Sequence, residues 1–194
     1  MNLNMERLVI GGGALVLGLA AGWMVRGVAT YNVATASETV YEDWRVVCPQ
    51  AQAEGVACEV SGDVVDPALK ATVARISIAR DFKNKDNANA EVIGFTLPPN
   101  VDLTKNVGVQ VGKDPVKTYK YRSCNGQACT AIVPLEPAML AAMKAGTETK
   151  ISFIGAQANA KAQSLAVSYK GFSAARRAYD RGNSKRTSWF WRMF

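Results

Sequence analysis

The 194-residue sequence contains no histidine. Histidine is the side chain that enzymes use most often as a general base near neutral pH, and it is a common ligand of transition metals. Its absence removes most hydrolase and metalloenzyme mechanisms. Apolar residues make up 48% of the chain and charged residues 20%, a composition typical of folded proteins. We therefore expect a folded binding, structural or assembly protein with no catalytic residues, no metal and no cofactor.

Nucleophilic catalysis without histidine requires a serine–lysine pair, an amino-terminal threonine or a free thiol. Ser168 and Lys170 stand two residues apart and would share one face of a strand. Because simple alternation explains that spacing, we do not expect them to form a catalytic pair.

The net charge of +7 is concentrated at the carboxyl end. Residues 170–194 contain seven basic residues and one acid, whereas residues 1–169 contain sixteen basic residues and fifteen acids. A nucleic-acid-binding domain is expected to have its basic residues on the folded body. The nearly neutral body therefore argues against a nucleic-acid partner.

An uncharged apolar segment occupies residues 8–25, between Arg7 and Arg26. As a helix it would be about 27 Å long, close to the ~30 Å thickness of a bilayer core. We expect one transmembrane helix, retained as a signal anchor, with the body outside the cytoplasm. The alternative is a signal peptide cleaved after Ala36, where Ala34 and Ala36 satisfy the small-x-small rule.

Small residues recur at four-residue spacing within this segment, at Ala14, Gly18 and Gly22. Such a row allows a second membrane helix to approach closely, which predicts lateral packing against a partner helix. The alternative is that glycine and alanine are simply common in membrane segments.

Four cysteines are present, and nine and four residues separate the members of successive pairs. The wider spacing does not fit a four-cysteine zinc site. An even number of cysteines after an export segment predicts two disulfides in an oxidising compartment. Three pairings exist for four cysteines, and we expect local pairing of Cys48 with Cys58 and of Cys124 with Cys129.

Short strand-like runs separated by turn-forming residues follow from position 40 onward. Eight of them predict a mainly β fold, an antiparallel sandwich or barrel-like domain. They are residues 40–47, 71–79, 91–97, 107–111, 116–121, 130–134, 149–154 and 164–169.

Two short helices are expected among the strands. The first covers residues 136–145, with Pro137 in its first turn and Gly146 after its end, and the second covers residues 172–181 and ends at Gly182. The predicted organisation is an anchor and linker at residues 1–36, a β domain at 37–182 and a tail at 183–194.

The order of several motifs resembles the invasion-associated locus B (IalB) family of α-proteobacterial envelope proteins. The resemblance extends over residues 40–180. It rests on Trp44-x3-Cys48, the LPPNVDL loop that begins at Leu97, Tyr121-x2-Cys124-x4-Cys129 and Gly171-Phe172-Ser173-Ala174-Ala175. It implies an exported β-rich domain with disulfides, without a known cofactor or an established enzymatic site.

Seven of the last ten residues are basic or aromatic. Tryptophan rings favour the headgroup level of a membrane, and lysine and arginine favour its phosphates. We expect contact with anionic lipid headgroups or a membrane protein; the alternatives are packing on the chain's own domain and outer-membrane sorting. The expected contact residues are Arg176, Arg177, Lys185, Arg186, Trp189, Phe190, Trp191, Arg192 and Phe194.

Together these features predict a non-catalytic accessory subunit of the bacterial inner membrane with its domain in the periplasm. The partner would be a larger integral membrane complex, for example a respiratory or photosynthetic one. The alternative is an exported IalB-like factor, released after signal cleavage, that binds a host or envelope ligand. A third hypothesis, an enzyme or carrier for a small molecule, requires a pocket inside the β domain.

Overall fold

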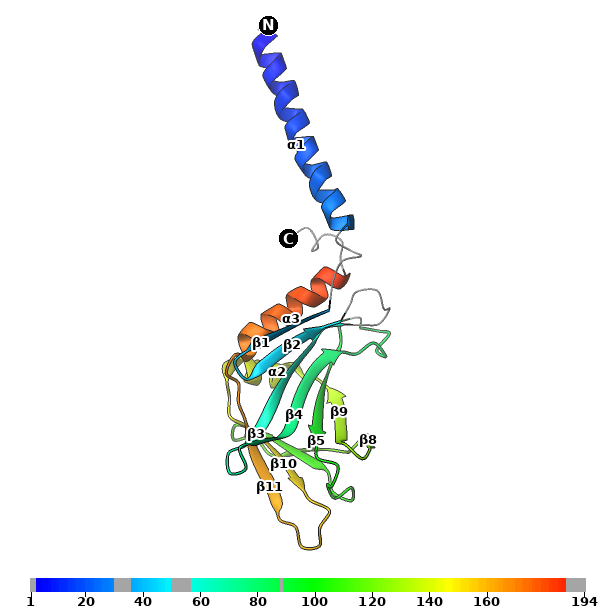
Figure 1. Ribbon diagram of the computed structural model, residues 1–194, viewed down its shortest axis with the longest axis vertical. Helices are drawn as coiled ribbons and strands as arrows, with labels where there is room; N and C mark the ends of the chain where they lie inside the picture. The colour runs from blue at the N-terminus through cyan, green and yellow to red at the C-terminus, as the bar shows by residue number, and fades with distance from the viewer. Residues whose placement is uncertain (1–2, 30–35, 50–56, 88, 188–194) are drawn as a thin grey trace.

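The computed structural model describes residues 3–29, 36–49, 57–87 and 89–187, with side chains of the first helix described for residues 12–26 and those of the last helix through Ser184. The fold is mainly β, with two antiparallel sheets and three helices. Figure 1 shows the two sheets and the last helix packed together, with the first helix projecting from them.

The larger sheet has seven strands in the order β1-β2-β3-β4-β5-β9-β8. Each strand pairs antiparallel with its neighbours. The strands are β1 (Ser37–Tyr41), β2 (Trp44–Cys48), β3 (Glu59–Asp66), β4 (Ala71–Arg80), β5 (Glu91–Leu97), β8 (Ser123–Cys124) and β9 (Cys129–Pro134).

The smaller sheet has four antiparallel strands in the order β11-β10-β6-β7. They are β6 (Val107–Val111), β7 (Lys117–Tyr119), β10 (Thr149–Ile154) and β11 (Ala162–Val167). The helices are α1 (Leu3–Ala29), α2 (Pro137–Ala145) and α3 (Phe172–Thr187). In the larger sheet, α3 contacts β1, β2 and β3.

Alternating residues of the strands form one core between the larger sheet, the smaller sheet and α3. On β5, for example, Ile93, Phe95 and Leu97 are at most 2% exposed, whereas the residues between them are only partly buried. This is the period-two pattern of a sheet with one buried face. Burying such side chains stabilises the fold by about 1.5–3 kcal/mol each.

The predicted strand at residues 40–47 is wrong in one respect, because it is a hairpin. β1 and β2 are joined by a two-residue turn at Glu42 and Asp43, and Glu42 has a φ of 54°. Tight hairpin turns require this left-handed conformation, which glycine and asparagine adopt most readily. Without either residue, the turn gives no recognisable sequence signal.

Strand β3 lies in the middle of the larger sheet, between β2 and β4, and the predicted strands do not include it. Its residues Ser61, Gly62 and Asp63 are poor strand formers. Gly62 is required by packing, because a Cβ there would lie 2.7 Å from Cε2 of Trp44. The central strand therefore has an atypical composition for a tertiary reason.

Both predicted body helices are present. α2 ends as expected at Gly146, which has a φ of 71°. The predicted end of α3 at Gly182 is wrong, since the helix continues to Thr187. The boundary drawn at residue 182 between a domain and a tail therefore falls inside a helix.

The apolar segment at residues 8–25 lies within α1. Seven large apolar side chains of this helix are 54–71% exposed. They are Leu15, Val16, Leu17, Leu19, Trp23, Met24 and Val25. Across the residues whose structure is described, no helix is both long and apolar enough to cross a membrane.

Candidate functional site

Two of the motifs that carry the family resemblance, those of Trp44 and of Gly171-Phe172, meet at the contact between β2 and the start of α3. The Trp44 ring lies edge-to-face with Phe172 at 4.7 Å between centroids, and both side chains are at most 1% exposed. The Trp44 indole N–H donates a hydrogen bond of 2.8 Å to the carbonyl of Ser168. A buried tryptophan with its N–H paired is a stabilising arrangement.

Gly171 positions α3 against this tryptophan. It has a φ of 81°, and a Cβ there would lie 2.0 Å from the Tyr41 carbonyl oxygen. Both the backbone conformation and the close approach exclude a side chain. The Gly171-Phe172 pair is therefore a packing motif, which connects the helix to the β1–β2 hairpin.

The other end of α3 packs on the first disulfide. Cys48 and Cys58 are bonded, as expected from local pairing. A Cβ on Gly182 would lie 2.6 Å from Sγ of Cys58 and 3.0 Å from Sγ of Cys48. The side-chain oxygen of Asn183, which is 2% exposed, accepts a 2.8 Å hydrogen bond from the Cys58 backbone N–H.

Gly182 therefore permits contact with sulfur and does not end the helix. The sequence predicted neither this role of Gly182 nor that of Asn183. The only signal in the sequence is a Gly-Asn pair within a basic segment, which is equally typical of a turn.

The chain enters and leaves the β domain beside this disulfide. Ser37, the first residue of β1, pairs with Cys48, and Gly182 lies against the same cysteine. Figure 1 shows the beginning of β1 and the end of α3 at the same end of the molecule, the end from which α1 projects.

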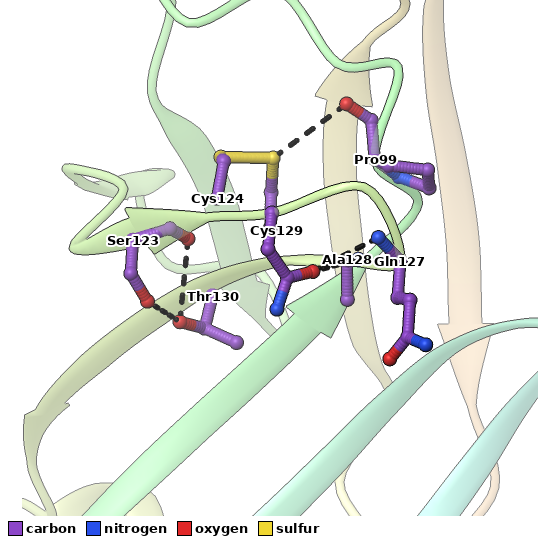
Figure 2. The surroundings of a disulfide bond; sticks show 8 residues. Pro99, Ser123, Cys124, Gln127, Ala128, Cys129 and Thr130 are labelled. Carbon is purple, nitrogen blue, oxygen red and sulfur yellow. Dashed lines mark hydrogen bonds between the residues drawn. A yellow bond between two sulfur atoms is a disulfide. The ribbon is translucent and has the colours of Figure 1, made fainter.

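The second predicted disulfide, Cys124–Cys129, also forms and joins β8 to β9 across a hairpin. The Asn125 side chain accepts hydrogen bonds from the backbone N–H groups of Gln127 and Ala128, and so holds the turn. Figure 2 shows this disulfide, with Cys129 Sγ 3.8 Å from the Pro99 carbonyl oxygen. The bond fastens the edge of the larger sheet.

Arg176 was predicted to contact a membrane or a partner, and this prediction is wrong. The residue is 7% exposed, and Nη2 donates a 2.8 Å hydrogen bond to the Glu91 carboxylate while Nε donates one of 3.0 Å to Asp180. Charged groups this deeply buried are expected to be paired. Arg176 connects α3 to β5, inside the molecule.

Tyr179 also belongs to this buried cluster. Arg176 lies over the ring of Tyr179, with Cζ 4.8 Å from the centroid. Burial, followed by the charge of Glu91, raises the pKa of the Tyr179 hydroxyl far above its usual value. The hydroxyl therefore remains protonated throughout the physiological pH range.

The remaining predicted contact residues have different positions. Arg177 is exposed on α3, and Lys185 and Arg186 lie in the last turn of the same helix. Gly18 and Gly22 have open space where a Cβ would lie, and Ala14 is exposed on the same helix. Residues Trp189, Phe190, Trp191, Arg192 and Phe194 lie outside the described residues.

Two cavities adjoin these contacts. One of about 310 Å³ is lined by residues of the Arg176 cluster, including Glu91 and Tyr179. The other, of about 440 Å³, lies at the β1–β2 turn, where the Ser168 hydroxyl donates a 2.5 Å hydrogen bond to Asp43. In the described ranges, no three metal-ligating side chains are grouped to hold an ion.

Three known proteins are similar to this chain in sequence or in fold. Two relatives from Brucella abortus, the Invasion protein B homologs of strain 2308 and of biovar 1 strain 9-941, are each 27% identical over 145 residues, which is 74% of this chain and 79% of the relative. The crystal structure of invasion associated protein B from Bartonella henselae matches with a TM-score of 0.59 at 20% identity, over 74% of this chain and 96% of that one. A family model described as Invasion associated locus B (IalB) protein matches residues 44–180. The chain therefore belongs to the IalB family.

Proposed function

We propose that this IalB family member is a non-catalytic envelope protein held on the periplasmic face of the inner membrane by α1, where it serves as an accessory subunit of a larger membrane complex. The observation that carries the proposal is the uncovered apolar surface of α1 at the end of a disulfide-bonded domain. The proposal has three parts: location outside the cytoplasm, attachment by α1, and a partner within the membrane.

The location is supported by the two disulfides. Disulfides persist in oxidising compartments and are rare in the cytosol of most bacteria. One of them is at the contact with α3, and the other fastens the sheet edge, so both bonds contribute to the folded structure. Family membership supports the same envelope location.

Attachment is supported by the composition and exposure of α1. A helix that is apolar around its whole circumference requires a covering of lipid or protein. The uncharged sequence extends over residues 8–25, and the structure describes its side chains from Gly12 onward. At about 27 Å, this helical segment would approximately match a bilayer core.

Intact mass and fractionation test the attachment. We expect the mature protein to retain Met1, to stay with inner membranes after an alkaline carbonate wash, and to lose its β domain to protease in spheroplasts but not in intact cells. A mature chain beginning at Ser37 and found in the soluble periplasm would refute the anchor. It would support the alternative, an exported binding factor released after Ala36.

The partner is tested by changing the small-residue row. A Cβ built on Gly18 or Gly22 would have no neighbouring atom within 4 Å. A second helix therefore has room to pack closely against these glycines. We expect Gly18→Leu and Gly22→Leu to release the protein from a larger assembly on native gels after mild detergent extraction. Gly13→Leu, which lies about 140° from Gly18 and about 180° from Gly22 around the helix and also has open space where a Cβ would lie, is the matched control. A lone monomer for the unmodified protein would refute the accessory role.

A further inference from the structure

The basic residues of α3 are divided between two sides of the helix. Arg176 faces inward and is paired with Glu91 and Asp180. Arg177 and Arg181 are exposed, and they stand four residues apart on one helical face. The sequence continues this spacing with Lys185, in the last turn of α3.

The exposed charge of α3 is not neutralised by acids of the same segment. Asp180 is the single acid in residues 170–194, and its carboxylate accepts hydrogen-bonding contacts from the buried Arg176. The outward face therefore presents a net positive charge at the end of the molecule where the chain also enters the domain from α1.

We propose that the outward face of α3, at Arg177 and Arg181, binds the anionic phospholipid headgroups of the leaflet from which α1 emerges. The inference rests on the proposed function, since α1 brings this end of the domain to the membrane. Guanidinium groups match phosphate geometry with paired N–H donors. The aromatic residues that follow in the sequence are of the type that occupies the interface.

The geometry favours lipid over an acidic protein surface as the occupant. Ser37 follows α1 by a short connection, and β1 leads from it directly to the Cys48–Cys58 disulfide on which Gly182 packs. With α1 in the bilayer, the last turns of α3 are therefore held near the headgroups. Each basic residue near an anionic surface strengthens the interaction by about fivefold.

Hydrogen exchange of the full-length chain in lipid nanodiscs tests the inference. The discs are made from phosphatidylcholine alone or with added phosphatidylglycerol, and exchange is followed in peptides from residues 177–187. We expect slower exchange in the phosphatidylglycerol discs, and we expect high salt to reduce the difference. In the double variant Arg177→Gln/Arg181→Gln, the factor by which phosphatidylglycerol slows exchange should fall by up to about 25-fold.

A matched control removes two charges from the opposite end of the molecule. Lys70 and Lys161 lie in the exposed turns of the β3–β4 and β10–β11 hairpins, so Lys70→Gln/Lys161→Gln should exchange like the unmodified chain. Circular dichroism verifies that both double variants are folded. Equal protection in the two lipids, or equal losses for the two double variants, would overturn the inference while leaving α1 as the anchor. Failure of the chain to enter the discs would overturn the proposed function as well.

Discussion

Arg176 and Arg177 are adjacent in the sequence but have different roles, because they lie on different faces of α3. Successive positions on a helix are separated by about 100°, so Arg176 reaches the Glu91 carboxylate while Arg177 is exposed. Composition alone assigns both residues to the same basic segment. Their separation depends on which face of α3 meets β5, and that contact joins residues far apart in the sequence.

Replacing each arginine by glutamine separates the two roles. Arg176→Gln leaves Glu91, whose side chain is 14% exposed, without its cation. Breaking a buried pair from one side typically lowers the free energy of unfolding by about 3–5 kcal/mol. Arg177→Gln should change it by about 0.5 kcal/mol or less. Urea denaturation measures both, and equal values would contradict the assignment of Arg176 to the interior.

Tyr179 makes the stability depend on alkaline pH. Burial and the Glu91 charge raise the pKa of its hydroxyl in the folded protein, whereas an unfolded tyrosine ionises near pH ~10. The folded state therefore holds this proton more tightly than the unfolded state. The contribution is complete below about pH 10 and is lost as the pH rises above that value.

Denaturation of the unmodified protein and Tyr179→Phe across this range measures the effect. The unfolding free energy of the unmodified protein should fall more steeply with pH than that of the variant, because phenylalanine has no proton to lose. Parallel pH profiles would show that the hydroxyl is not perturbed in the folded state.

At the scale of elements, α3 depends on contacts at both of its ends. Gly171 lies against the Tyr41 carbonyl, and Gly182 lies against both sulfurs of the first disulfide. Because neither glycine has a side chain, the backbone at each position can lie in direct contact with β1 or with the disulfide that begins at the end of β2. The length of α3 is thus set by tertiary packing more than by helix propensity.

Gly182→Ala tests the sulfur contact. Alanine is the better helix former, so an exposed site would gain stability from this change. Here the added methyl would overlap Cys58 Sγ at 2.6 Å, and we expect a loss of about 1–3 kcal/mol. Gly126→Ala, where a Cβ would meet nothing within 4 Å, is the control for thermal unfolding. A Gly182→Ala protein as stable as the unmodified chain would mean that α3 can move away from the disulfide without cost.

For the whole molecule, local patterns predicted much of the fold. Alternation identified β4, β5 and β10, and the Pro137 and Gly146 signals identified α2, because in each case the local sequence agrees with the tertiary environment. The disulfide partners followed from short spacing. These features need no knowledge of distant residues.

The features that could not be predicted are those determined by distant contacts. Gly62 makes β3 resemble a turn because the Trp44 ring occupies the space of its side chain. Gly182 resembles a helix end because two sulfur atoms lie beside it. The candidate site shares this property, since Glu91 and Arg176 are 85 residues apart in the sequence.

The chain enters and leaves the β domain beside a single disulfide, so both connections lie at one pole of the molecule. The ten residues of β4 alone extend about 33 Å, and the tips of the β3–β4 and β10–β11 hairpins lie toward the opposite pole (Figure 1). Under the proposed attachment by α1, these hairpin tips would be the first part of the protein met by anything approaching from the outer side of the envelope.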